Sequence, residues 1–172
     1  MKTMKVAGDR FTVQDYAELP EGFPAQLIDG FLVKEEPLYG HQQIVMRVLT
    51  TLARAIDPRY VLPSPVGVSI DEYNVFHPDV AVYSQIPPFH ERRTLVPVVV
   101  FEVLSPSTRR RDRGYKCRRY LEVGVGEVWL VDSAERVIEI HTRSGARVAR
   151  GAEVAASEIV SGFTLIPQEL PA

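Results

Sequence analysis

The sequence has only one cysteine, Cys117, among its 172 residues. A lone cysteine excludes an intrachain disulfide and a cysteine zinc cage, and it is typical of a protein from a reducing compartment. The chain also lacks any run of about 18 apolar residues, the length that a membrane span needs. Residues Met1 to Arg10 carry charges but no apolar segment of the kind found in export signals. We therefore expect a cytoplasmic protein that does not bind a membrane.

Two other patterns are missing. The four histidines show no paired spacing typical of metal ligands, so a zinc site is not indicated. The sequence has neither a Gly-x-Gly-x-x-Gly loop nor a Walker phosphate loop, which argues against an enzyme acting on a small phosphorylated molecule. The net charge of −2 excludes a globally basic nucleic-acid binder.

Positive charge is nevertheless concentrated in one segment. Seven Lys and Arg residues and a single Asp lie between Arg109 and Arg119, a local charge of +6 that leaves −8 for the rest of the chain. Such a patch can attract phosphates whatever the total charge, and the alternative is a solvated arginine-rich helix face. The expected nucleic-acid contacts are Arg109, Arg110, Arg111, Arg113 and Arg119.

The length and the hydrophobic pattern predict one domain over residues 1–172, of mixed α/β class with a central sheet. Capping signals and apolar residues at helical spacing predict helices over 12–18, 39–56 and 107–123. Asp29-Gly30 between two short apolar runs predicts a hairpin. Further strands are predicted over 60–62, 66–70, 79–83, 96–104, 127–132, 136–142 and 146–149, with an edge strand over 163–166. The order strand, helix, strand from 96 to 132 predicts a parallel crossover.

The strand predicted over 96–104 contains one carboxylate in an otherwise apolar run. Alternation places Glu102 on the same face as Val98 and Val100, so it does not belong to a solvent-facing side. Burying an unpaired carboxylate costs several kcal/mol or forces its protonation, so such a residue needs a metal, a lysine or a hydrogen-bond network. Glu102 is therefore the first candidate for a functional residue.

A second carboxylate, Asp79, opens the strand predicted over 79–83. If the two strands are neighbours, Asp79 and Glu102 come close together. Two carboxylates and a backbone carbonyl such as that of Val103 are oxygen ligands suited to Mg²⁺ or Mn²⁺, which keep several waters for substrate exchange. We therefore expect a magnesium or manganese cofactor.

The helix predicted over 107–123 follows at once, and a start at Ser107 would place its first turns over the carboxyl end of the strand, where open α/β sheets bind ligands. At 100° per residue, one face of this helix is ionic and holds Arg109, Asp112 and Lys116. The opposite face packs and holds Gly114, Cys117 and Leu121. The alternative is that Asp112 and Lys116 form an ordinary surface ion pair.

Other conspicuous side chains are expected to be structural. Aromatic residues at the start of helices and in strands usually pack in the core, and we expect this of Tyr16, Tyr39 and Trp129. The same expectation applies to Cys117.

Several of these residues occur together in a known family. The shared residues are Pro78-Asp79, the run from Glu102 to Thr108, Asp112, Lys116, Tyr120 and the run from Gly124 to Asp132. Leu27-Ile28-Asp29-Gly30, His41 and Ser161-Gly162-Phe163 extend the similarity over nearly the whole chain. In this ordered set the sequence resembles the Uma-two family of restriction endonucleases, which belongs to the PD-(D/E)XK nuclease superfamily.

The resemblance implies a restriction-endonuclease-like core, in which helices flank a central mixed sheet, with an N-terminal hairpin and C-terminal antiparallel strands. It also implies that Asp79, Glu102 and the Val103 carbonyl bind the metal. The superfamily usually has a lysine two residues after the second carboxylate, where this chain has Leu104, and the resemblance implies that Lys116 supplies the ammonium instead. Accessory roles are implied for Gln26, His41, Asp112 and Tyr120.

The function implied by the resemblance is metal-dependent endonucleolytic cleavage of DNA, with a homodimer suited to cutting both strands of a duplex. The alternative is a nuclease fold with weakened catalysis that serves as a nucleic-acid-binding or protein-interaction module. Gln26 favours the alternative, because relatives tend to carry Glu at this position and an amide contributes no charge to a metal.

Overall fold

The structure is a computed structural model and describes residues 10–20, 22–34, 36–86, 93–106 and 108–171. Its helices are α1 (Val13–Ala17), α2 (Tyr39–Ala55), α3 (Arg109–Arg111) and α4 (Cys117–Val123), with 3-10 turns at Pro58–Tyr60 and Pro167–Glu169 and a π turn at Asp112–Lys116. Its strands are β1 (Ala25–Ile28), β2 (Phe31–Lys34), β3 (Val61–Pro63), β4 (Gly67–Asp71), β5 (Asn74–Phe76), β6 (Val80–Val82), β7 (Arg93–Thr94), β8 (Val99–Val103), β9 (Glu127–Asp132), β10 (Val137–Thr142), β11 (Gly145–Arg150), β12 (Ala155–Ala156) and β13 (Thr164–Leu165).

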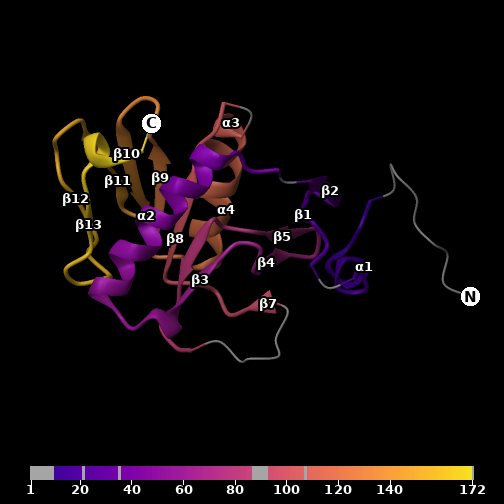
Figure 1. Cartoon of the computed structure of the whole chain (residues 1–172). Coiled ribbons are helices and arrows are strands. Elements are labelled where there is room, and N and C mark those ends of the chain that lie inside the picture. The colour runs from indigo at the N-terminus through magenta and orange to yellow at the C-terminus, as the bar shows by residue number, and fades with distance from the viewer. Residues whose placement is uncertain (1–9, 21, 35, 87–92, 107, 172) are drawn as a thin grey trace, which may run out of the picture.

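The strands form two main sheets and a short hairpin (Figure 1). The central sheet has the order β11-β10-β9-β8-β6-β3, and a second sheet has the order β2-β1-β5-β4-β7. β8 runs parallel to β9 and antiparallel to β6, so the central sheet is mixed, as predicted. None of the helices formed by the described residues is long and apolar enough to cross a bilayer.

The two faces of β8 point into different parts of the core. Phe101 and Val103 pack with α2 and the β12–β13 hairpin, and Val100 and Leu104 pack with α4. Glu102 alternates with Val100 and Leu104 and therefore lies on the side of α4. The prediction that its carboxylate is buried on an apolar face is confirmed, since Glu102 is 4% exposed.

Most predicted elements are confirmed where the local signals are strong. Thr12 and Asp15 form a capping box at the start of α1, and α2 matches the helix predicted over 39–56. Asp29 and Gly30 have φ angles of 51° and 81° in the β1–β2 turn, the left-handed region that this hairpin turn requires. The parallel crossover from β8 to β9 is also confirmed.

Three parts differ from the prediction. The sequence analysis missed β5, β7 and β12, because strands of two or three residues are too short to show alternation. The segment 163–166 does not extend the central sheet, since β13 pairs only with β12. The helix predicted over 107–123 is interrupted by the π turn. Its predicted first residue, Ser107, lies outside the described residues, and Thr108 is the N-cap of α3.

The expected core positions of the aromatic residues are confirmed only in part. Trp129 and Cys117 are buried, as expected, and Tyr16 is half-buried with its hydroxyl donating to the Ala25 carbonyl at 2.9 Å. Tyr39 is 81% exposed, so its expected core position is wrong. It is the first residue of α2, where the side chain projects beyond the packed turns of the helix.

A second buried carboxylate, Glu127, joins β9 to the C-terminal segment. It is 1% exposed and accepts hydrogen bonds from Trp129 Nε1 at 2.9 Å, Ser157 Oγ at 2.7 Å and the Glu158 N–H at 2.8 Å. Glu127→Ala would leave these donors without their acceptor. We therefore expect the free energy of unfolding to fall by about 3–5 kcal/mol in urea titrations. Glu158→Ala, which removes an exposed carboxylate, should change it by less than about 0.5 kcal/mol. Equal effects of the two substitutions would contradict this role of Glu127.

Candidate active site

Glu102 lies in β8, and Asp79 directly precedes β6, the neighbouring strand of the central sheet. Extended by one residue beyond the pair Val80–Phe101, the antiparallel register places Asp79 across from Glu102. The Asp79 carboxylate also accepts a hydrogen bond from the Val103 N–H at 2.7 Å. The two carboxylates singled out in the sequence therefore meet at the carboxyl end of β8.

The Lys116 ammonium lies against Glu102. Its Nζ is 2.6 Å from Glu102 Oε1 and 3.8 Å from Asp112 Oδ1. Lys116 is 1% exposed and Asp112 is 3% exposed. The alternative of a surface ion pair between Asp112 and Lys116 is therefore wrong, because both side chains are buried.

Tyr120 gives Glu102 a second donor. The Tyr120 hydroxyl donates to Glu102 Oε1 at 2.7 Å, and Tyr120 is fully buried. Burial raises the pKa of Glu102 to about 8; the Lys116 ammonium opposes this shift, and the Asp112 and Asp79 carboxylates add to it. Burial and the Glu102 carboxylate raise the pKa of Tyr120 well above its ordinary value, so its hydroxyl remains a donor.

We call Asp79, Glu102, Asp112, Lys116 and Tyr120 the Glu102 cluster. Two of its three carboxylates, Glu102 and Asp112, face the Lys116 ammonium, and Asp112 Oδ1 is buried without a hydrogen-bond partner among the described residues. This excess of carboxylate oxygen fits a hard divalent cation. Within the described ranges no three His, Cys, Asp or Glu side chains converge as a metal cage. The fit therefore depends on two carboxylates, Asp79 and Glu102, together with the Val103 carbonyl.

The π turn explains how the helix presents Lys116 to the sheet. The N–H of Cys117 bonds to the Asp112 carbonyl, five residues earlier in the chain. A turn closed in this way rotates the backbone less per residue than an α-helix does, so Asp112, Lys116 and Tyr120 all lie on the buried side. Gly114 lies in the middle of the turn, with open space around it. Such turns occur frequently at functional sites.

Arg109 pairs with acidic residues outside the Glu102 cluster. Its guanidinium lies 3.0 Å from Asp132 Oδ2 and 3.6 Å from Glu135 Oε1. Asp132 is 1% exposed at the end of β9, and the sequence analysis did not single it out. The signal that identified Glu102, a carboxylate in an apolar strand, could also have identified Asp132.

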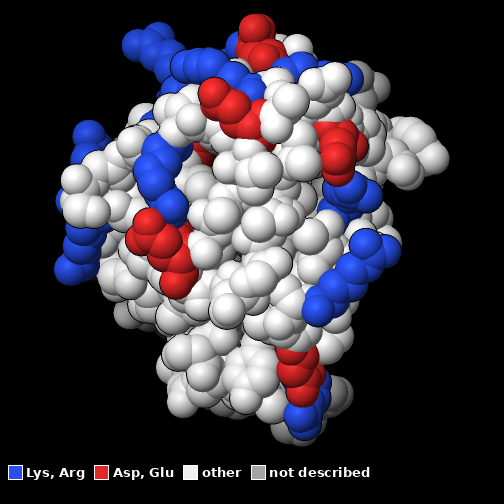
Figure 2. Space-filling view, turned by 90° about the vertical axis from the view of Figure 1, so that its left-hand side faces the viewer, with Lys and Arg blue, Asp and Glu red and all other residues white. Residues whose placement is uncertain are grey.

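Other arginines of the basic segment are also paired within the chain. Arg113 lies 2.7 Å from Glu139 Oε1, and Arg119 pairs with Asp71 and Glu122. On the face shown in Figure 2, Lys and Arg gather along the upper margin with acidic side chains among them, and no continuous basic stripe crosses the centre. Much of the local charge of this segment is therefore neutralised by the fold.

Arg110 and Arg111 differ from the other three predicted nucleic-acid contacts. Arg110 is exposed and forms no ion pair with the described residues, and Arg111 Nε is 3.7 Å from Asp112 Oδ1. Both belong to α3, the helix that comes after β8, and Arg111 adjoins Asp112 of the cluster. Their role as nucleic-acid contacts stays a prediction.

Two predicted accessory residues come from the N-terminal half. His41, in the first turn of α2, places Nε2 at 3.2 Å from Asp79 Oδ2. Gln26 is fully buried in β1 and accepts a hydrogen bond from the His77 N–H at 3.4 Å, two residues before Asp79. The structure thus brings His41 to the carboxylate pair and Gln26 to the segment that leads into it.

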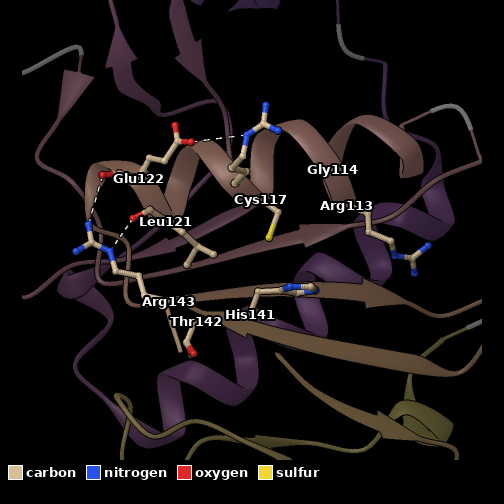
Figure 3. Close-up of a pocket in the computed structure, with 9 residues that line it drawn as sticks. Arg113, Gly114, Cys117, Leu121, Glu122, His141, Thr142 and Arg143 are labelled. Atoms are coloured by element: carbon tan, nitrogen blue, oxygen red, sulfur yellow. Dashed lines mark hydrogen bonds and ion pairs between the residues drawn. The ribbon is translucent and has the colours of Figure 1, made fainter. Parts of the chain in front are cut away.

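Gly114, Cys117 and Leu121 line a hollow of about 480 Å³ between α4 and β10 (Figure 3). The prediction that this face packs holds for Cys117, which is buried, but is wrong for Gly114, which is exposed. Arg143 closes one end of it by donating from Nε to the Leu121 carbonyl at 3.0 Å. Burial raises the pKa of Cys117 to about 11, so its thiol remains protonated near neutral pH. No residue of the Glu102 cluster lines this hollow.

Comparisons with known proteins agree with the fold. The crystal structure of "a putative nuclease belonging to DUF820" from Anabaena variabilis superposes with a TM-score of 0.80, at 19% identity, over 93% of this chain and 97% of that chain. No curated protein matches. The model of the Uma2 family, described as "Putative restriction endonuclease", matches residues 13–170. This match covers most of the sequence, and the chain therefore belongs to the Uma2 (Uma-two) family.

Proposed function

We propose that the protein is a metal-dependent endonuclease that hydrolyses phosphodiester bonds in DNA, with Mg²⁺ or Mn²⁺ as its cofactor. The observation that carries the proposal is the position of Lys116 Nζ, 2.6 Å from Glu102 Oε1, on a strand that pairs with the one directly after Asp79. Two carboxylates and a lysine are the groups implied by the PD-(D/E)XK resemblance, and here the lysine comes from the helix. Membership of the Uma2 family and the shared fold support the proposal.

The roles follow from the chemistry of each group. Asp79, Glu102 and the Val103 carbonyl would bind the cation, which when bound polarises a phosphodiester oxygen and lowers the pKa of a bound water. Lys116 would orient the attacking water and stabilise the negative charge that develops on the phosphate. Tyr120 fixes the orientation of Glu102 through its 2.7 Å hydrogen bond.

Metal removal provides the test of this function. The purified protein is expected to nick or linearise supercoiled DNA and to degrade single-stranded DNA with Mg²⁺ or Mn²⁺, and to lose this activity in excess EDTA. Adding back Mn²⁺ should restore it. Cleavage that persists in EDTA would contradict the metal-dependent mechanism. Salt-dependent DNA binding without any cleavage would favour the alternative of a binding module with weakened catalysis.

A further inference from the structure

The β1–β2 turn contacts the helix that carries Lys116. The Tyr115 hydroxyl donates a hydrogen bond to the Asp29 carboxylate of this turn and lies 3.2 Å from Asn74 Oδ1. Tyr115 directly precedes Lys116 in the π turn, so the contact ties this turn to a segment 86 residues earlier in the chain. Asp29 belongs to the motif Leu27-Ile28-Asp29-Gly30, which has no part in the proposed chemistry.

Hydrogen bonds also hold the residues around the Tyr115 hydroxyl. Asn74, 3% exposed at the start of β5, accepts from the Asp29 N–H at 2.9 Å. Its Nδ2 donates to the two carboxylate oxygens of Asp71 at 2.9 and 3.0 Å. Asp71 in turn pairs with Arg119 of α4. The β1–β2 and β4–β5 turns therefore form one hydrogen-bonded block that contacts two successive turns of the helix.

Aromatic packing joins the same elements. The Phe76 ring of β5 packs edge to face with the rings of Tyr115 and Tyr120, at centroid distances of 6.0 and 5.4 Å. Lys116 Nζ lies 5.7 Å from the centre of the Phe76 ring. Tyr115→Phe would keep this packing and remove only the hydroxyl, so the variant isolates the hydrogen bond to the β1–β2 turn.

The π turn depends on contacts of this kind. Such a turn is a rare departure from the α-helix, so the surrounding structure decides whether it persists. A turn that relaxed to α-helical geometry would rotate Lys116 away from Glu102, whose Oε1 lies 2.6 Å from the ammonium. Burial and the Asp29 carboxylate raise the pKa of Tyr115 to about 12, so its hydroxyl remains a donor near neutral pH.

We propose that the hydrogen bond from Tyr115 to Asp29 holds the π turn in the geometry that places Lys116 against Glu102. Tyr115 and Asp29 are positioning residues, and neither contacts the substrate. The expected effect on cleavage rests on the proposed function, whereas the effect on the position of Lys116 does not.

The first test measures the cleavage rate. Tyr115→Phe should lower kcat by about 10- to 100-fold with KM unchanged, because a displacement of about 1 Å in a catalytic group has effects of this size. In the Lys116→Met background the same substitution should cost no further rate. Asp29→Asn keeps an acceptor and suits the left-handed backbone at φ 51°, so kcat should stay within about threefold of the wild type. Tyr73→Phe is the matched control, since the Tyr73 hydroxyl, on the β4–β5 turn, forms no hydrogen bond with the described residues; its kcat should be unchanged.

The second test needs no DNA. Lys116 is 1% exposed, so an amine-acylating reagent should label it far more slowly than the exposed Lys34. Mass spectrometry of peptides, normalised to Lys34, should show labelling of Lys116 that is about tenfold faster in Tyr115→Phe and unchanged in Tyr73→Phe. Glu127→Ala, which is expected to destabilise the whole fold, should accelerate this labelling less than Tyr115→Phe does.

The outcomes separate this inference from the proposed function. Equal labelling of Lys116 in Tyr115→Phe and Tyr73→Phe overturns the inference, whether or not the protein cleaves DNA. Faster labelling in Glu127→Ala than in Tyr115→Phe also overturns it, because the effect would then follow global stability. In a protein that cleaves DNA, an unchanged kcat for Tyr115→Phe, or a further loss of rate in the Lys116→Met background, overturns the positioning role. Faster labelling in a protein that does not cleave DNA supports the inference and overturns the proposed function alone.

Discussion

Lys116→Met is expected to lower the rate of DNA cleavage by about 100- to 10,000-fold, the usual contribution of a positioned proton-transfer group. The substitution keeps the approximate volume of the side chain but removes the ammonium that contacts Glu102. Metal binding by the carboxylates should persist, so the defect should appear in kcat and not in the metal concentration needed for activity. A variant that cleaves as fast as the wild type would show that Lys116 has only a structural role.

A double variant at Glu102 and Lys116 can separate effects on folding from effects on catalysis. Removing either charge alone leaves the other buried without its 2.6 Å partner, which should cost about 3–5 kcal/mol in free energy of unfolding. The double variant Glu102→Gln/Lys116→Met removes both charges and should be more stable than either single variant. All three should remain inactive. Recovery of stability without recovery of cleavage, measured by urea titration and plasmid nicking, would show that the lost activity is not caused by unfolding.

Glu102→Gln is expected to reduce cleavage by about three orders of magnitude, since a metal ligand contributes several kcal/mol to transition-state stabilisation and each 1.4 kcal/mol is about tenfold. The amide keeps the size of the side chain and can still accept the hydrogen bond from Tyr120. The substitution should also remove the stabilisation by Mn²⁺, which for the wild type is about 2.7 kcal/mol at a concentration 100 times the Kd.

Glu169→Gln is the matched control for that experiment. Glu169 is an exposed carboxylate paired with Arg47 at 3.0 Å, and it lies outside the Glu102 cluster. Its replacement should leave both the cleavage rate and the shift of the melting temperature with Mn²⁺ unchanged. A melting temperature that rises with Mn²⁺ to the same extent in Glu102→Gln would contradict the assignment of Glu102 as a metal ligand.

The parts of the fold that local chemistry decides could be predicted from the sequence. The turn at Asp29-Gly30, the apolar stripe of α2 and the alternation in β8 each depend on residues a few positions apart, and all three are confirmed. The strand β5 pairs with its chain neighbour β4 and with the distant β1, and β7 pairs with β4; with three and two residues, both strands are too short to show an alternating pattern. The π turn at Asp112–Lys116 adds one residue to a turn of the helix. A prediction that assumes 100° per residue along a regular α-helix does not detect it.

The same distinction holds for the candidate site. A carboxylate in an apolar strand is unusual, so the sequence alone indicates Glu102 as a functional residue. The position of Lys116 beside it was implied only by the resemblance to a known family. The acidic partners of the arginines could not be predicted from the sequence, because Asp71 lies 48 residues from Arg119 and Asp132 lies 23 residues from Arg109. A basic segment in a sequence therefore says little about free positive charge until its acidic partners are known.

The central claim is that Asp79, Glu102 and Lys116 form one catalytic centre although the lysine comes from the helix. The most direct measurement compares the rates at which wild type, Glu102→Gln and Lys116→Met nick supercoiled DNA in Mn²⁺, at protein concentrations matched for folded protein. The account predicts metal-dependent nicking by the wild type and loss of it in both variants. Nicking by the wild type that survives in either variant would contradict the claim.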